Sequence, residues 1–249
     1  IIIMASLKEV KGRIASVNST RKITSAMKMV ASAKLHKAQA AIESMLPYER
    51  RLHHILTDFM SNCTEVTSPF IVKREVKKVA VVVFASNTSL CGGFNANVIR
   101  HLVDLLAEYK PLGLENILVF PVGKKVADAV RKLGFRIEGD FQHMADKPSY
   151  QEAADLAADL MKRFLHGDVD KVELLYNHFK STASQILTRE TYLPIDLNNE
   201  KKEEERTIDY ILEPSAEELM QEMLPKVLRM KMFTVLLDSN AAEHAARTM

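Results

Sequence analysis

The loop Ser89-Leu-Cys-Gly-Gly-Phe-Asn95 is the part of this 249-residue chain best suited to bind a phosphate. It follows a β-branched run and opens a helical pattern, and the backbone N–H groups at the start of a helix attract anions. The loop matches neither GxGxxG nor GxxxxGK(S/T), and no acidic ribose ligand follows at a recognisable distance. Two interpretations stay open, a nucleotide site and a tight strand-to-helix turn at Gly92 and Gly93.

Cysteine and histidine supply the other reactive groups. No motif gives Cys91 an activating histidine, so a buried, inert thiol is the simpler interpretation. The pairs His53-His54 and Glu243-His244 lack a metal-ligand spacing such as HExxH and are interpreted as polar faces of helices. The sequence therefore predicts no catalytic residues, no cofactor-binding residues and no metal site.

A long basic helix is the feature best suited to bind a partner. Residues 7–40 contain no proline, and their apolar residues recur at steps of three to five, which is typical of one helical stripe. Continued to about Met45, the helix has roughly 40 residues and spans on the order of 60 Å, so part of it must protrude from a small domain. Between Lys8 and Lys37 the only acidic residue is Glu9, so this stretch is strongly positive. Its basic residues are Lys8, Lys11, Arg13, Arg21, Lys22, Lys28, Lys34 and Lys37.

Three kinds of partner suit this helix: nucleic-acid phosphates, anionic lipid and an acidic protein surface. No aromatic residue lies between positions 5 and 45, so base stacking finds no platform there. The methionines at 27, 29 and 45 suit either an adaptable partner surface or a packed core. Composition leaves these alternatives open, together with a basic face that is merely solvated.

Composition limits the class of protein. Apolar residues make up 47% of the chain and charged residues 27%, with a net charge of +2, which allows one sizeable domain plus an accessory element. No run approaches the roughly 18 uncharged apolar residues of a membrane span, so any membrane association is expected to be peripheral or through partners. Cys63 and Cys91 are the only cysteines, which suits a reducing compartment and predicts a cytoplasmic location.

Strand and helix patterns alternate in the middle of the chain. The run Val79–Phe84 is typical of a strand buried on both faces of a parallel sheet. This alternation predicts a Rossmann-like open α/β sheet with helices on both faces. The other strands are expected at 116–122, 135–141, 172–176 and 184–193, and the helices at 94–109, 124–133 and 149–164.

Two striped helices enclose this α/β domain in the sequence. Leu46-Pro47 predicts a break or kink in the first, whose pattern then continues to about Asn62. Ser215 and Glu218 have the spacing of a capping box, after which a second stripe continues towards the C-terminus. Each helix can bury its apolar stripe against the stripe of the other, which predicts an antiparallel coiled coil.

The predicted organisation is a globe on a two-helix rod. Along the chain its parts are an N-terminal coiled-coil helix (4–62), a linker (63–75), the Rossmann-like α/β domain (76–197), a charged loop with a short connector (198–213), and a C-terminal, truncated coiled-coil helix (214–249).

Five blocks of residues resemble the gamma subunits of F-type ATP synthases. The block Ile14–Leu35 is similar to the family's N-terminal helix nearly throughout. Shorter similar blocks follow in order at 90–95, 176–182, 209–214 and 239–247. The sequence shows no regulatory insert of the chloroplast type and no transit peptide, which favours the bacterial type.

The resemblance implies a central-stalk rotor subunit that is not itself catalytic and binds no cofactor. In this family the helical pair rises into a ring of alternating alpha and beta subunits, and the globe lies near the epsilon subunit and the membrane-embedded c-subunit ring. Rotation couples proton flow to ATP synthesis or hydrolysis at the beta subunits. The implied location is the cytoplasmic face of the bacterial inner membrane. The resemblance implies that the chain is a peripheral component, which reaches the membrane only through its partners, and that it binds no nucleic acid.

The resemblance also implies partner-facing residues. Beta subunits of the family present an acidic loop to the shaft, and Met27 and Arg247 match positions near the place where the shaft passes them. The implied residues at the alpha/beta ring are Arg21, Lys22, Met27, Lys28, Lys34 and Arg247. At the base of the stalk, near the c ring and the epsilon subunit, they are Tyr210 and Glu213.

Family members usually continue beyond the block ending at Arg247 through a further helix of several turns, whereas this chain ends at Met249. Residues 7–17 are therefore expected to lack a helical partner. Two other classes remain as alternatives. A nucleotide-dependent α/β enzyme would need the loop 90–95 to bind phosphate, and a nucleic-acid-binding protein would use the basic helix.

Overall fold

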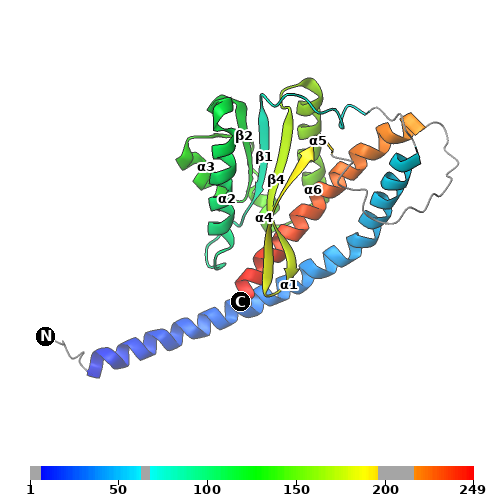
Figure 1. Cartoon of the computed structure of the whole chain (residues 1–249). Helices are drawn as coiled ribbons and strands as arrows, with labels where there is room; N and C mark the ends of the chain where they lie inside the picture. Colours follow the sequence, from blue (N-terminus) through cyan, green and yellow to red (C-terminus); the bar gives the residue numbers. More distant parts are fainter. Residues whose placement is uncertain (1–6, 63–67, 196–215) are drawn as a thin grey trace.

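The computed structural model describes residues 7–62, 68–195 and 216–249, with the backbone alone described at 53, 54, 56–62, 216 and 217. A long N-terminal helix, an α/β globe and a long C-terminal helix follow one another along the chain (Figure 1). The two long helices lie side by side over part of their length and run in opposite directions (Figure 1).

The globe is built on one five-stranded sheet in the order β3-β2-β1-β4-β5. The first four strands in this order are parallel, and β5 pairs antiparallel with β4. Every residue of β1 and β2 is buried, which confirms the interpretation of their continuous apolar runs. The strands are β1 (Val79–Phe84), β2 (Ile117–Val122), β3 (Arg136–Ile137), β4 (Lys171–Ser181) and β5 (Ser184–Leu193).

Helices cover both faces of the sheet, which confirms the predicted Rossmann-like class. Alternate residues of β1 point to opposite faces, so Val81 belongs to one apolar core and Val82 to the other. The first core is closed by α2 (Phe94–Tyr109) and α3 (Lys124–Leu133). The second is closed by α4 (Gln142–Asp146), α5 (Tyr150–His166) and α6 (Ala216–Thr248), and two 3-10 turns, η1 (Lys110–Leu112) and η2 (Leu114–Asn116), precede β2.

The C-terminal helix α6 belongs to the core of the globe, which the coiled-coil prediction missed. Apolar residues on every fourth position of α6 lie on one face and are buried against the sheet and α5. A shorter stripe of alanines faces the N-terminal helix instead. The buried residues on the globe side are Met220, Leu224, Leu228, Met232 and Leu236.

The N-terminal helix α1 (Leu7–Asn62) continues through Pro47, so of the predicted break or kink the break does not occur. Proline has no N–H, so the carbonyl of Glu43 loses its helical donor, but both residues are exposed and water can replace it. The first buried residue of α1 is Ala31. Residues 7–30 are all exposed, so the stretch without a helical partner is longer than the predicted 7–17.

Some predicted boundaries differ from the structure. The strand expected at 135–141 is only two residues long, and α4 was not predicted. The strand β4 extends to Ser181 because its hairpin with β5 reaches beyond the sheet to the long helices, where Phe179 packs between them. The charged loop at 198–213, Ser215 and the first part of the linker lie outside the described residues.

Candidate partner interface

Residues 7–30 of α1, called here the basic segment, form the largest continuous exposed element of the described chain. Its large apolar side chains are exposed, for example Leu7 at 74% and Val17 at 65%. Within the described residues its only ion pair joins Arg13 Nη2 to Glu9 Oε1 at 2.9 Å. A helix with free charges and free apolar side chains has the composition of a binding surface.

The predicted partner-facing residues of α1 are all exposed, Met27 at 45%. Successive residues of a helix are rotated by about 100°, so Arg21 and Lys28, two turns apart, share a face, while Lys22 and Lys34 point to other sides. In the part of the chain that the structure describes, none of these four basic residues has an acid within 4.0 Å. The charges therefore surround the helix, as suits a rod with partners on several sides.

The two long helices touch along a seam of small residues. Leu35 and Ala38 of α1 pack against Ala241 and Ala245 of α6, and both of these alanines have no exposed surface. Small side chains let two helices approach closely. Phe179, from the tip region of the β4–β5 hairpin, packs against the same cluster.

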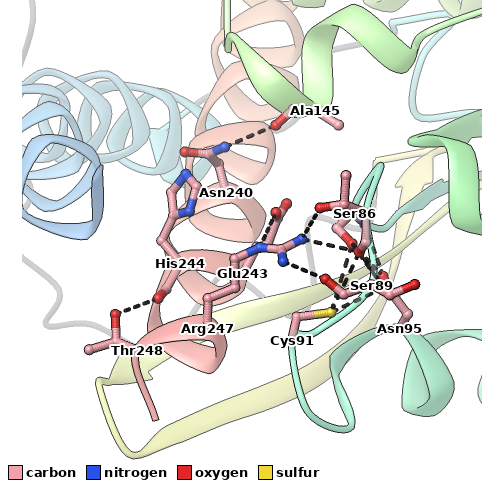
Figure 2. A network of polar contacts seen from close by, with 11 residues as sticks. Ser86, Ser89, Cys91, Asn95, Ala145, Asn240, Glu243, His244, Arg247 and Thr248 are labelled. Atoms are coloured by element: carbon pink, nitrogen blue, oxygen red, sulfur yellow. Dashed lines mark hydrogen bonds and ion pairs between the residues drawn. The ribbon is translucent and has the colours of Figure 1, made fainter. Parts of the chain in front are cut away.

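Arg247, also predicted to face a partner, is bonded to the globe (Figure 2). Its Nη1 donates to the carbonyl of Ser89 at 2.6 Å, and its Nη2 donates to Thr88 O at 3.1 Å and Thr88 Oγ1 at 2.7 Å. Its Nε donates to Glu243 Oε1 at 2.9 Å. Nearby, Asn240 Nδ2 donates to the carbonyl of Ala145 at 3.0 Å. The guanidinium thus ties the end of α6 to the loop that follows β1.

Glu243 and His244 are buried, at 8% and 7% exposed, so their interpretation as a polar helix face is wrong. Burial raises the pKa of Glu243, against the lowering effect of Arg247. Burial, followed by the charges of Lys34 and Arg247, lowers the pKa of His244 to about 4. His244 is therefore neutral at neutral pH, and its Nδ1 has no hydrogen-bond partner among the described residues.

The candidate phosphate loop is engaged within the protein. Asn95 holds its start, because its Oδ1 accepts the N–H of Ser86 at 3.0 Å and its Nδ2 donates to Ser86 Oγ at 2.8 Å. Cys91 is buried against Phe94 and Ala242, as an inert thiol would be. The loop's carbonyls at Thr88 and Ser89 already accept Arg247.

Doubly wound sheets bind ligands outside the carboxyl ends of their strands, and α6 fills that place here. Ser239, Asn240 and Glu243 of α6 face the ends of β1 and β2. The gap between them is a cavity of about 10 Å³. This volume holds a water molecule at most, so a nucleotide does not fit between α6 and the ends of these strands.

Metal ligands and membrane-spanning helices are two features that the sequence did not predict. Within 7–62, 68–195 and 216–249, no group of three or more His, Cys, Asp or Glu is placed to hold a metal ion. None of the helices in this described part is long and apolar enough to cross a membrane. The predicted base residues Tyr210 and Glu213 lie outside the described residues.

Asp238 is a junction residue that the sequence interpretation missed. Its Oδ1 accepts the N–H of Phe179 at 2.8 Å, and its Oδ2 lies 2.6 Å from His178 Nδ1. The available signal was the group of polar residues after Leu237, which interrupts an otherwise apolar helix. A polar residue among buried neighbours must find a bonded partner.

A long two-helix rod with an α/β globe bonded to one of its helices defines the class of protein as a shaft subunit. The chain belongs to the gamma chain family of ATP synthase. The family model described as ATP synthase matches residues 6–249.

Individual relatives agree with this assignment. The ATP synthase gamma chain of Phocaeicola vulgatus is 80% identical over 248 residues, covering 99% of this chain and 86% of the relative. That of Bacteroides thetaiotaomicron is 60% identical over 257 residues, with the same coverage.

Solved structures share the fold at lower identity. A chain of the Tetrahymena thermophila mitochondrial ATP synthase central stalk and c-ring gives a TM-score of 0.63 at 21% identity, covering 91% of this chain and 96% of that one. A chain of the Euglena gracilis mitochondrial ATP synthase rotor gives a TM-score of 0.59 at 18% identity, covering 96% and 86%. These matches support the observed combination of globe and long helices.

Proposed function

We propose that this chain is the central-stalk rotor subunit of a bacterial ATP synthase. It couples proton flow through the membrane sector to ATP synthesis or hydrolysis by rotating inside the catalytic head. Its partners are the alpha and beta subunits, the epsilon subunit and the c-subunit ring. The observation that carries the proposal is the exposed basic segment, a rod that extends beyond the globe and presents charge on several sides (Figure 1).

Asymmetry of the rod supplies the coupling. A single helix with different side chains on each face cannot make equal contacts with three beta subunits around it. Each orientation of the rod then favours a different conformation, and so a different nucleotide affinity, at each catalytic site. Because such coupling is reciprocal, proton flow drives ATP release, and hydrolysis drives the rotor backward.

Catalysis belongs to the beta subunits, and this chain contributes no catalytic residue. The filled crevice at the carboxyl end of its sheet supports this division. The complex lies at the cytoplasmic face of the inner membrane, and the chain is a peripheral component that reaches the membrane through its partners. We also propose that Tyr210 and Glu213 contact the c ring or the epsilon subunit.

Reconstitution tests the rotor function directly. The chain is assembled with alpha, beta and epsilon subunits and the membrane sector in vesicles, and ATP-driven proton pumping is measured beside ATP hydrolysis. The proposal predicts that pumping requires the chain. Equal pumping with and without it would sink the proposal.

Electrostatic contact with an acidic loop of the beta subunits is proposed for Arg21, Lys22, Lys28 and Lys34. Exposed ion pairs contribute only about 0–1 kcal/mol each, so these residues tune contact and do not hold the complex together. Replacing all four by glutamine should lower torque and the ratio of pumping to hydrolysis while assembly persists. Unchanged torque and coupling would contradict the proposal.

A matched control keeps the number of removed charges constant. Glutamine replaces four exposed lysines of the globe, Lys77, Lys110, Lys132 and Lys162. The net charge of the chain falls equally in both variants. Only the variant in which the four basic residues of α1 are replaced should show a lower torque.

Met27 is proposed to lie where the shaft passes the beta subunits. Because its side chain is 45% exposed, Met27→Lys should leave folding intact but place a poorly accommodated charge at the interface. Pumping should fall relative to hydrolysis, and Met29→Lys, at a 66% exposed position on a different face, should have a smaller effect. Normal pumping by the Met27→Lys complex would count against this placement.

A further inference from the structure

Among the side chains that the structure describes, the globe is bonded to α6 and packed against α1. Besides the bonds of Asn240 and Arg247, α6 accepts a hydrogen bond from Tyr192 Oη to Leu228 O at 2.8 Å. Lys231 on α6 pairs with Glu190 of β5 at 3.3 Å. Among the α1 side chains that the structure describes, hydrogen bonds and ion pairs stay within α1, and contact with the globe is through the apolar seam.

Two of the α6 anchors lie on opposite sides of the helix. Asp238 and Arg247 are nine residues apart, which at about 100° per residue is about two and a half turns and at about 1.5 Å per residue is on the order of 14 Å along the axis, so the two side chains point to opposite sides. Asp238 holds the β4–β5 hairpin at His178 and Phe179. Arg247 holds the loop after β1.

Opposed anchors resist rotation of the helix about its own axis. When the helix turns either way, both sets of bonds lengthen, and hydrogen bonds weaken steeply as their geometry departs from the optimum. The two side chains are partly sheltered from water, Asp238 at 13% exposed and Arg247 at 14%. The apolar seam with α1 is non-directional and offers no comparable resistance.

We propose that α6 is the helix through which the globe turns the shaft, and that Asp238 and Arg247 are positioning residues that fix the rotational angle between α6 and the globe. This inference rests on the proposed rotor function. In it, α1 presents the surface that partners meet, and α6 carries the torsional load from the globe. Besides the apolar packing of α6 against the sheet and α5, two side chains that touch neither nucleotide nor ion contribute to the stiffness of that link.

The angular fluctuation of single complexes tests whether Asp238 and Arg247 fix the angle between α6 and the globe. The catalytic head, assembled with this chain and the epsilon subunit, is fixed to a surface, and a bead is attached to a cysteine at Lys132 of the globe in a Cys63→Ser background. The variance of the bead angle during catalytic pauses reports torsional stiffness. Asp238→Ala with Arg247→Ala should raise the variance at least about twofold, because two charge-assisted anchors are lost.

Control variants distinguish loss of the two anchors from a general loss of structure. Lys226→Ala removes an exposed charge on α6 that bonds only Glu222 in the described residues, and it should leave the variance unchanged. Arg247→Lys keeps the charge and part of the donor set, so its variance should be intermediate. Hydrolysis by the head should remain within about twofold in Lys226→Ala, which leaves every predicted partner-facing residue intact.

The outcomes are distinct. A double variant with the variance of the wild type would overturn the inference. If the double variant does not assemble, Asp238→Asn and Arg247→Gln, which keep the size of each side chain, are measured in its place under the same criterion. A wild-type complex whose bead does not rotate would defeat the proposed rotor function itself, whatever the variants do.

Discussion

The two long helices of this chain have opposite relations to the globe. The helix α1 has 56 residues, and its first 24 described residues are all exposed. The helix α6 has 33 residues, and much of it is buried against the sheet, α5 and α1. Sequence patterns that look alike in both helices therefore serve different purposes. Apolar residues in α6 fix the chain to itself, whereas those of the basic segment remain available to other chains.

The largest effect that can test this comparison is loss of a core side chain from α6. Leu224 has no exposed surface, so Leu224→Ala should reduce the free energy of unfolding by about 2–5 kcal/mol through lost burial and the cavity left behind. Leu7→Ala, at a 74% exposed position of α1, should change it by less than about 0.5 kcal/mol. Urea unfolding followed by circular dichroism measures both. Similar losses in the two variants would remove the distinction between the helices.

The seam between the helices should be the next most sensitive place. Ala241 is fully buried between α6 and α1, so Ala241→Leu should overpack it and lower the free energy of unfolding by about 1–3 kcal/mol. Ala40→Leu, at an exposed position of α1, is the matched control and should be close to neutral. Equal stability of both variants in urea unfolding would mean that the seam is loose enough to accept the larger side chain.

A smaller, pH-dependent effect is expected at His244. Its pKa is lowered to about 4 in the folded chain against an ordinary value near 6.5, because burial disfavours the imidazolium. Between these values the unfolded chain binds the extra proton, so the free energy of unfolding falls as the pH drops from about 6.5 to about 4, by up to about 3 kcal/mol. His244→Gln should lack this part of the decline. Parallel pH profiles for wild type and variant, measured by urea unfolding, would refute it.

Much of the fold could be predicted because its signals are local. The apolar pattern of the run Val79–Phe84 and of 94–109, 124–133 and 184–193 indicates their secondary structure, and glycines flank the two helices at 94–109 and 124–133. The alternation of strands and helices then constrains the topology. For the candidate interface, exposure of the basic segment could be anticipated from its density of like charge.

The polar junction could not be predicted, because it depends on contacts between distant segments. Glu243 and His244 look like any polar pair on a helix until the loop after β1 is brought beside them. Pro47 failed as a helix breaker for a related reason. The carbonyl of Glu43 that loses its helical donor is exposed, so water can take the place of the missing N–H.

The position of Arg247 has an evolutionary consequence. In place of a diffusible ligand, the carboxyl end of the sheet meets side chains of α6, which belong to the same polypeptide. Arg247, one turn after Glu243, bonds the loop that follows β1. Two of the three globe acceptors of Arg247 are main-chain carbonyls, which every residue type provides. Substitution of the side chains in the loop after β1 would therefore leave these two hydrogen bonds of Arg247 in place.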